Sequence, residues 1–497
     1  MSFYGKEPED SAVDIDLQAD FSMDGSTTTV KGFYAGNGVY KLRFYPERTG
    51  IYTYQVKGIF TDRGSLECEE SNLLGMVRAE ECHFVYQDGT LFHPFGTTVY
   101  ALLHQPRELI EQTFVTLEKA PFNKVRLCVF PKHCMYNEND PELYPFEKNG
   151  DGGWDVHHPC YRFWDHLEDS LKRLSGMGIQ SDLILFHPYD CWGFSSLSQR
   201  DNLVYLDYVM RRLSAYPGIW WSIANEYDLV FHRTMEEWYE LEAFILENDP
   251  YGHLISNHNC MKLYDFSRPG ITHCCVQTSA MHMAKQWRRK YRKPVVFDEC
   301  CYEGDIEPDW GNISGFEMTN RFWKACSLGA YASHGETFYN EKEILWWSKG
   351  GALKGESPAR IGFLLEILEN LPGALSPWEE RDPGDPNNEK KEENAGTENP
   401  FIRLMNSLSD VDRTNLEWKS PVYAGHIGRD VYLKYYGNQC IRVASILLPE
   451  EGSYKIELLD AWNMTRKTLK EHAAGHTALM LPGREGMAVL AVREGEM

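Results

Sequence analysis

The sequence lacks any apolar run long enough to cross a membrane. None of its 497 residues fall in a stretch near the roughly 20 apolar residues that a spanning helix needs. Residues 1–20 also lack the basic and apolar regions of a secretory signal. Positive charge is scarce, because 50 Lys and Arg stand against 73 Asp and Glu, a formal net charge of −23. We therefore expect a cytoplasmic protein with neither nucleic acid nor membrane as a partner.

Motifs for metals and phosphates are missing as well. The 13 cysteines form no CxxC pair, and adjacent pairs such as Cys274–Cys275 lie in apolar runs, as free thiols of a reducing compartment do. Asp155, His157, His158 and His187 could be drawn together as metal ligands, but no HExxH or similar spacing supports such a site. We expect no metal and no cofactor.

Four segments follow one another along the chain. Residues 1–85 alternate polar and apolar positions in short runs separated by turn residues, which predicts an immunoglobulin-like β-sandwich. Residues 86–375 alternate strand and helix patterns. Residues 376–420 are expected to be an acidic linker or loop that is partly disordered, because residues 377–400 hold Pro, Asn and Glu and almost nothing apolar. Residues 421–497 return to strand alternation and predict a C-terminal β-sandwich.

The long central segment has the pattern of a (β/α)8 barrel. A doubly wound sheet would carry a Gly-rich phosphate loop after its first strand, and here that strand continues into Tyr100-Ala101-Leu102-Leu103. Eight apolar runs separated by amphipathic stretches match a barrel in number and size. The expected strands are 95–103, 123–130, 180–186, 219–225, 253–257, 271–278, 294–299 and 329–338. The predicted fold class is thus a multidomain α/β and all-β protein, with a central (β/α)8 TIM barrel flanked by two β-sandwich domains.

Polar side chains stand where these apolar runs stop. Active sites of such barrels lie at the carboxyl ends of the strands, so these residues are the candidates for the site. They are Arg126 on the second strand, His187 after the third, Asn225 and Glu226 at the end of the fourth, Gln277 on the sixth, Glu299 at the end of the seventh, and His334 and Glu336 on the eighth.

Glu226 and Glu299 carry the clearest chemistry. Strands four and seven face each other roughly across an eight-stranded barrel, so both carboxyl groups can reach one cleft. Glycosidic bond cleavage needs a carboxyl pair, one group as acid and the other as nucleophile or base. Two such groups must titrate differently to perform these roles together.

The chain resembles the glycoside hydrolases of clan A, and within them the apiosidase-like barrels that carry an N-terminal β-sandwich and a small C-terminal β-domain. The resemblance rests on Asn225-Glu226, on Glu299 and on the strand context of both. It implies that Glu226 is the acid/base and Glu299 the nucleophile of a retaining mechanism. It also implies that Asn225 holds the sugar 2-hydroxyl and that Arg126 orients the nucleophile.

One feature departs from that resemblance. Many members of the clan place a tyrosine at the end of strand six in contact with the nucleophile, whereas here the strand ends in Gln277-Thr278-Ser279. Tyr302, three residues after Glu299, is the candidate to replace that tyrosine.

Aromatic residues in the loops are candidates for sugar platforms. The segment from Pro131 to His158 is long for a barrel loop and holds Trp154, and Trp192 follows strand three. Either tryptophan could stack on a sugar or form the core of its own loop. Trp346-Trp347, after strand eight, is comparable.

We expect a retaining, exo-acting glycosidase for short oligosaccharides or glycosides. Two alternatives remain open: an endo-acting β-glycanase such as a glucanase or mannanase on the same barrel, and a carbohydrate-binding protein without turnover. The second is disfavoured because a pure binder gains nothing from holding two carboxylates close together. The sugar, the linkage and the oligomeric state, a homo-oligomer included, stay open.

Overall fold

The computed structural model describes residues 1–71, 74–379, 400–409, 411–412 and 422–495. The segment predicted as an acidic linker, 376–420, lies largely outside these ranges. The described chain forms two compact units: Met1–Ser279 with Trp287–Met318 and Ala330–Leu365, and Ala280–Gln286 with Thr319–Gly329 and Glu366–Met497. Within the described ranges no helix combines the length and the apolar character needed to cross a membrane.

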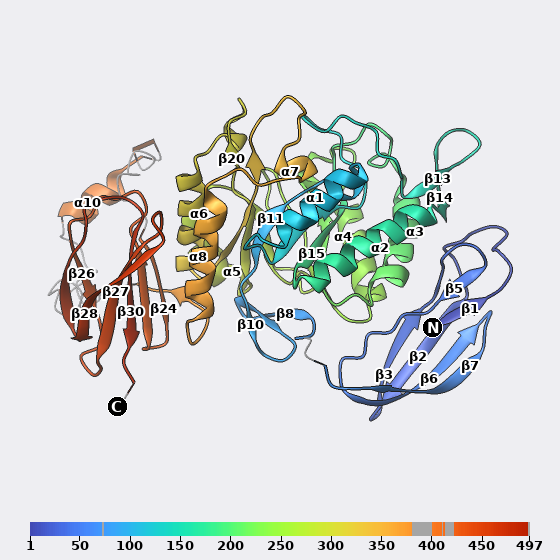
Figure 1. The fold of residues 1–497 in the computed structure, drawn as a ribbon, viewed down its shortest axis with the longest axis horizontal. Coiled ribbons are helices and arrows are strands. Elements are labelled where there is room, and N and C mark those ends of the chain that lie inside the picture. Colours follow the sequence, from blue (N-terminus) through green and yellow to red (C-terminus); the bar gives the residue numbers. More distant parts are fainter. Residues whose placement is uncertain (72–73, 380–399, 410, 413–421, 496–497) are drawn as a thin grey trace. The chain divides into compact units, whose positions relative to one another are not determined.

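An eight-stranded parallel sheet forms the centre of the first unit (Figure 1). Its strands in chain order are β11 (Phe95–Thr98), β12 (Lys124–Cys128), β15 (Gln180–Phe186), β16 (Ile219–Ala224), β17 (Leu254–Ser256), β18 (Cys274–Gln277), β19 (Val295–Glu299) and β21 (Tyr331–His334). Each strand pairs with its predecessor, and β11 also pairs with β21, except that β17 and β18 form no ladder. The predicted TIM barrel and the multidomain fold class are confirmed.

The opening between β17 and β18 is bridged by single hydrogen bonds. The Thr272 amide donates to the Ile255 carbonyl at 2.9 Å, and the Ser256 hydroxyl donates to the His273 carbonyl at 2.7 Å. The barrel is therefore nearly closed. Both faces of its strands are covered, which explains why β15 and β16 are buried along their whole length.

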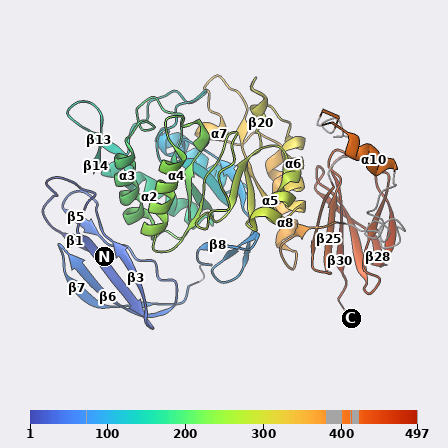
Figure 2. The ribbon, with the colours of Figure 1, turned by 180° about the vertical axis from the view of Figure 1, so that it is seen from behind.

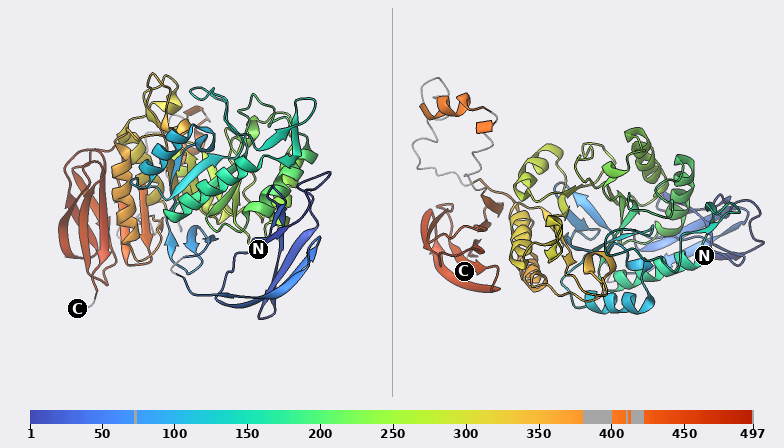
Figure 3. Two further views of the ribbon diagram at one scale, coloured as in Figure 1. Left: turned by 45° about the vertical axis from the view of Figure 1, so that its right-hand side comes forward. Right: turned by 90° about the horizontal axis from the view of Figure 1, so that it is seen from above.

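Helices alternate with these strands along the chain, and the two views of Figure 3 show helices enclosing the strands. They are α1 (Arg107–Leu117), α2 (Tyr161–Gly176), α3 (Gln199–Leu213), α4 (Met235–Asn248), α5 (Ala284–Tyr291), α6 (Gly315–Ser327), α7 (Trp346–Lys349) and α8 (Ser357–Glu369). Polar side chains cap the starts of α3 and α4, where Ser198 and Thr234 accept from backbone amides. Thr234 and Glu237, for example, form a reciprocal capping box at α4.

Two antiparallel sheets make up the N-terminal part of the first unit (blue in Figures 1 and 2). One has the order β3 (Ser26–Lys31), β2 (Leu17–Met23), β6 (Gly50–Gly58) and β7 (Asp62–Cys68), and the other joins β1 (Ser2–Tyr4), β5 (Val39–Lys41) and β4 (Phe33–Tyr34). The alternating residues of β2 are buried in a shared core that includes Tyr34, Tyr40 and Tyr52.

A small sheet covers the amino-terminal end of the barrel. It is formed by β8 (Val77–Glu80), β9 (His83–Tyr86) and β10 (Leu91–Phe92). Phe84 of β9 packs on Trp220, the second residue of β16, and on Tyr331, the first residue of β21. These contacts close that end of the barrel with apolar side chains.

The second unit holds the C-terminal sheets (red in Figure 1). Six strands run in the order β23 (Ser376–Pro377), β24 (Tyr423–Ile427), β25 (Val431–Tyr435), β30 (Met487–Arg493), β27 (Tyr454–Asp460) and β28 (Thr465–Ala473). A two-stranded sheet joins β26 (Val443–Leu447) and β29 (His476–Met480), and side chains of both sheets share one core.

Candidate active site

A cavity of about 420 Å³ opens at the carboxyl end of the barrel. The residues that line it follow or end the barrel strands, as the geometry of the fold requires of an active site. They are Tyr100, Lys132, Cys134, Met135, Tyr189, Glu226, Cys260, Gln277, Thr278, Ser279, Glu299, Cys301, Tyr302, Trp310 and Trp347. Glu226, Gln277, Glu299 and Tyr302 of the predicted site residues are among them.

Glu226 lies two residues beyond the end of β16 in a left-handed backbone conformation, with φ at +50°. Such a conformation is strained for a residue other than glycine and asparagine, and it turns the side chain out of the strand direction into the cavity. Neutral groups surround the carboxylate. Tyr189 donates from its hydroxyl, Gln277 donates from its amide at 3.1 Å, and Asn225 donates from its amide at 3.3 Å.

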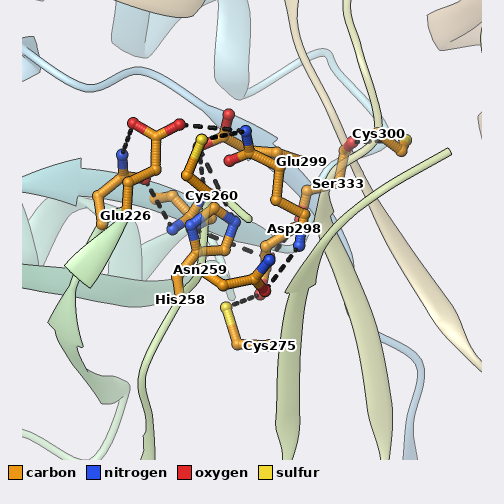
Figure 4. Close-up of polar contacts among 12 residues, drawn as sticks. Glu226, His258, Asn259, Cys260, Cys275, Asp298, Glu299, Cys300 and Ser333 are labelled. Atoms are coloured by element: carbon orange, nitrogen blue, oxygen red, sulfur yellow. Dashed lines mark hydrogen bonds and ion pairs between the residues drawn. The ribbon is translucent and has the colours of Figure 1, made fainter. Parts of the chain in front are cut away.

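Glu299 ends β19 at an irregularity in the sheet. Val276 pairs with Phe297 and the next residue, Gln277, pairs with Glu299, so β19 has one extra residue there. This bulge lets the consecutive residues Asp298 and Glu299 both reach the barrel interior, at different depths (Figure 4). A regular strand would send them to opposite faces.

Positive charge and a phenol contact Glu299. The Tyr100 hydroxyl donates to its Oε1, Arg126 Nη1 lies 3.4 Å from the same oxygen, and His258 Nε2 lies 3.9 Å away. Burial raises the pKa of Glu299, and the negative charge of Glu226 raises it further, while Arg126, Lys132 and the Tyr100 hydrogen bond act to lower it. Arg126, Lys132 and the Tyr100 donor thus favour the ionised form of Glu299, against burial and the negative charge of Glu226.

The neighbouring groups keep fixed protonation states. Burial raises the pKa of Tyr100 and of Tyr302 well above their ordinary value, so both remain neutral donors. Burial and then the charge of Arg126 hold the pKa of His258 well below its usual range, which leaves a neutral imidazole beside Glu299. The hydroxyl of Tyr100 lies 3.5 Å from that of Tyr302.

A buried ionic layer lies beneath the two glutamates. Lys124 Nζ donates to Asp182 at 2.8 Å and to Asp298 at 2.5 Å, and Arg126 Nε lies 3.5 Å from Asp182. All four side chains are at most 4% exposed. Arg126 Nη2 also donates to the Asn225 side chain at 3.3 Å, which ties the ends of β12 and β16 together. Ion pairs that are buried and paired in this way fix geometry at the cavity floor.

Three predicted site residues lie away from the cavity because they bond elsewhere. His187 is buried with Nε2 3.2 Å from the Phe130 carbonyl, and burial lowers its pKa to about 4. Trp154 donates to the Trp192 carbonyl and stacks on Phe194 at 4.5 Å, and the Trp192 indole donates to Asp140. The two tryptophans therefore belong to the small core of their own loops, and none of the three lines the cavity.

His334 and Glu336 are also buried outside the cavity. Glu336 accepts hydrogen bonds from the amides of Lys354 and Gly355, and Glu303 accepts from those of Glu356 and Ser357, so the carboxylates hold the start of α8. His334 Nδ1 lies 3.1 Å from the Thr97 hydroxyl. Glu303, His334 and Glu336 present atoms within 4.8 Å of one another, and each of the four carboxylate oxygens accepts a hydrogen bond from a backbone amide.

Sequence reasoning missed three residues that contact the glutamates or their partners. Tyr100 and Tyr189 donate to Glu299 and Glu226, and Lys132 lies against both tyrosine rings. Tyr189 lies in the strand-end segment His187–Asp190, and its place directly after an apolar strand is a signal that could have singled it out. The tyrosine hydroxyl that contacts Glu299 is that of Tyr100, which follows the first barrel strand. Tyr302, the residue proposed for this contact, lies with its hydroxyl 3.5 Å from that of Tyr100.

A TIM barrel with glutamates at the ends of strands four and seven in one cavity has the design of a glycoside hydrolase. Comparison with family models gives the particular family: residues 79–381 match the apiosidase-like catalytic domain. The chain belongs to this family of glycoside hydrolases, which implies a carbohydrate substrate, and the resemblance found in the sequence is confirmed. Residues 2–58 match the domain of unknown function DUF5060, and residues 418–491 match the domain of unknown function DUF5605.

Solved structures agree with this assignment. A protein of Bacteroides vulgatus ATCC 8482 that has been assigned to the glycoside hydrolases is 30% identical, with a TM-score of 0.85 over 99% of this chain and 98% of its own. A family 5 glycoside hydrolase of the same organism is 16% identical, with a TM-score of 0.59 over 84% of this chain and 94% of its own, which shows the fold alone. Comparison with curated proteins gave no match.

Proposed function

We propose that the protein is a retaining, exo-acting glycosidase for short oligosaccharides or glycosides, with Glu226 as acid/base and Glu299 as nucleophile. The observation that carries this proposal is the contrast between the two carboxyl groups in one cavity. Glu299 is contacted by Arg126, whereas Glu226 receives hydrogen bonds from the neutral side chains of Tyr189, Gln277 and Asn225. A cation favours the ionised form of its neighbour, so this contrast supports Glu299 as the nucleophile and Glu226 as the proton donor.

The first chemical step follows from the roles proposed for the two glutamates. The Glu299 carboxylate oxygen attacks the anomeric carbon while the glycosidic C–O bond breaks, and Glu226 gives its proton to the departing oxygen. This produces a glycosyl ester on Glu299 and an ionised Glu226. Glu226 then takes a proton from water, the water oxygen attacks the anomeric carbon, and the ester bond to Glu299 breaks with net retention of configuration.

Asn225 and Arg126 position these groups. Asn225 donates to Glu226, and its side-chain oxygen accepts from Arg126 and lies 3.0 Å from the Tyr100 hydroxyl. Asn225 therefore contacts both Glu226 and two of the groups that contact Glu299. We assign the sugar 2-hydroxyl to the Asn225 side chain. Arg126 is fully buried and keeps Glu299 in place from below.

The size and lining of the cavity support exo action on a small substrate. A volume of about 420 Å³ is on the scale of a small-molecule site rather than of an extended groove. Tyr302, Trp310 and Trp347 form an aromatic wall, with ring centres 5.1 to 6.1 Å apart. Such rings stack on the apolar face of a sugar. Five of the 13 cysteines are buried, four of them in barrel strands or α6 and Cys300 directly after β19. This cysteine usage fits the cytoplasmic location that short imported glycosides require.

Activity on a panel of aryl glycosides tests the assignment of function. Glucoside, galactoside, mannoside, xyloside, arabinofuranoside and apioside substrates should include one that the wild type cleaves. Glu226→Gln and Glu299→Gln should each lower kcat for that substrate by roughly 10³-fold or more, because each removes a group that acts in the transition state. If the wild type cleaves a glycoside and both variants cleave it at a similar rate, the proposal is contradicted.

Azide rescue tests the role of each glutamate separately. In Glu299→Ala, azide should attack the anomeric carbon directly and give a glycosyl azide of inverted configuration. In Glu226→Ala, azide should attack the glycosyl ester on Glu299 and give a product of retained configuration. A dinitrophenyl leaving group needs no proton, so the glycosylation rate of a dinitrophenyl glycoside should fall least in Glu226→Ala. Exchanged stereochemical outcomes would show that the two roles are reversed.

A further inference from the structure

Lys132 is the single cationic side chain among the described residues that line the cavity. It lies four residues beyond β12, and 3% of its surface is exposed. Its Nζ lies 3.3 Å from the centre of the Tyr100 ring and 4.3 Å from that of Tyr189. No carboxylate among the described residues comes within ion-pair distance of this ammonium group. Burying an ammonium group without a direct counter-ion costs free energy. We therefore ask what Lys132 does at this position.

The two rings that hold Lys132 are the two phenols that contact the glutamates. The Tyr100 hydroxyl donates to Glu299, and the Tyr189 hydroxyl donates to Glu226. The ammonium lies nearer to the Tyr100 ring. A cation on the face of a phenol withdraws electron density from the ring, which makes the O–H group a stronger hydrogen-bond donor.

We propose that Lys132 is a positioning residue of the active site, which acts through the Tyr100 ring to strengthen the hydrogen bond that Tyr100 donates to Glu299. The inference rests on the proposed function, in which Glu299 attacks the sugar as a carboxylate. Lys132 and Arg126 then stabilise this carboxylate from two sides. Arg126 contacts it directly from the barrel floor, and Lys132 acts across the aromatic ring at the cavity wall.

The other groups around Glu299 do not duplicate this role. The titratable and charged groups that face or influence it are Arg126, Tyr100, Tyr302, His258, Glu226, Tyr189, Cys128, Cys260 and Lys132. The phenols stay neutral because burial raises their pKa values, burial raises the pKa of both thiols to about 12, and His258 stays neutral because burial lowers its pKa. Apart from Arg126, none of these neighbours therefore places a positive charge beside Glu299 as Lys132 does.

Removal of the Lys132 charge has a predicted sign. Without the cation the ionised form of Glu299 is less favoured, so the pKa of Glu299 should rise by roughly one unit. The acidic limb of the kcat/KM profile reports the ionisation of this group in the free enzyme and should move to higher pH by the same amount. At pH values below the wild-type limb, kcat/KM should fall roughly ten-fold.

The experiment compares pH profiles of kcat/KM for wild type, Lys132→Met, Lys132→Arg and Lys148→Met. Lys132→Met should show the displaced limb, and Lys132→Arg, which keeps the charge, should stay close to wild type. Lys148 is the matched control, because its Nζ lies 3.2 Å from the Trp154 ring but outside the cavity. An unmoved acidic limb in Lys132→Met, or an equal displacement in Lys132→Met and Lys132→Arg, would overturn the inference.

A second measurement does not depend on turnover. Glutamate labelled with ¹³C at its carboxyl group allows titration by NMR, and the Glu299 signal is identified by its loss in Glu299→Gln. The signal should titrate at higher pH in Lys132→Met than in wild type. If no glycoside is cleaved but the titration moves, the proposed function fails and the role of Lys132 stands. If the titration of Glu299 is unchanged, the role of Lys132 is wrong whatever the activity.

Discussion

At the scale of single residues, the two glutamates differ in what donates to them rather than in how deeply they lie. Tyr100 and Arg126 contact Glu299, and Tyr189 and Gln277 contact Glu226. Sequence patterns predicted the glutamates because strand ends are readable from apolar periodicity. Tyr100 and Tyr189 were not predicted. Tyr189 lies in a strand-end segment that the sequence marks, but an aromatic residue after an apolar run is as common in a core as in a site, so that signal alone does not decide.

Replacement of Tyr100 by Phe tests the phenol contact. The change removes a hydrogen bond to a charged group and leaves the ring on which Lys132 lies. We expect kcat/KM to fall roughly 10- to 100-fold, as for other bonds to ionised partners. The acidic limb should also move to higher pH, because loss of this donor raises the pKa of Glu299.

Tyr339→Phe is the control for that change. Tyr339 is 54% exposed and lies outside the cavity lining, so its profile should match that of the wild type. A Tyr100→Phe variant with wild-type kcat/KM and an unmoved acidic limb would show that the hydroxyl has no part in stabilising Glu299.

At the scale of strands and loops, the eight predicted barrel strands are all present, and most are shorter than predicted. The first was expected over 95–103 and ends at Thr98, because the chain then turns through Leu102–His104 as a short 3-10 helix. Apolar residues of this turn are as buried as those of the strand, so hydrophobicity alone could not separate them. The bulge at Asp298 was also invisible, because a one-residue insertion leaves the apolar pattern unchanged.

The loop between α7 and α8 depends on a glycine. A Cβ atom on Gly355 would lie 2.4 Å from Glu303 Oε2 and 2.6 Å from Glu336 Oε1, so the loop could not keep its amides on these two carboxylates. Two buried carboxylates would then lose their donors. Gly355→Ala should destabilise the barrel unit by about 2 kcal/mol, seen as a lower Tm.

Gly176→Ala provides the comparison, because nothing lies within 4 Å of a Cβ atom at this last position of α2. Its Tm should equal or exceed that of the wild type, since alanine is the better helix former. Equal Tm values for Gly355→Ala and wild type would refute the role of the carboxylate pair in holding this loop.

At the scale of the whole molecule, the composition predicted several domains, and the barrel unit includes the N-terminal sheets. Arg43 makes one of the polar contacts between these sheets and the barrel. It donates to both oxygens of Glu168 in α2, at 2.7 and 2.6 Å, and to the Arg212 carbonyl at 2.6 Å. Arg43 and Glu168 are 125 positions apart, one in a β-sheet region and the other in a helix. No sequence pattern predicts such a pair, so this contact is known only from the structure.

Arg43→Met should lower the free energy of unfolding of the barrel unit by roughly 2 kcal/mol at neutral pH, which is measured as a lower Tm. Burial acts to raise the pKa of Glu168, but hydrogen bonds and charge from Arg43 and Arg212 outweigh it, and the pKa is lowered. The stabilisation is therefore present above the ordinary pKa of a glutamate and is lost as the pH falls through the lowered value.

The difference between wild type and Arg43→Met should accordingly shrink in acid. Thermal unfolding followed from about pH 7 to about pH 3 measures it, with Arg63→Met, an exposed arginine of β7, as the control. A constant difference across this range would contradict the assignment of the contact to an ionised Glu168.

Trapping the covalent intermediate tests the central claim most directly. A 2-deoxy-2-fluoro glycosyl fluoride of the sugar that the panel identifies should form the ester with the nucleophile and hydrolyse it slowly, because fluorine disfavours both positively charged transition states. Mass spectrometry of the digested protein should then find one added fluoroglycosyl group on the peptide that contains Glu299, and none in Glu299→Gln. A label on Glu226, or an unlabelled enzyme that releases product of inverted configuration, would contradict the retaining mechanism and the separate roles of the two glutamates.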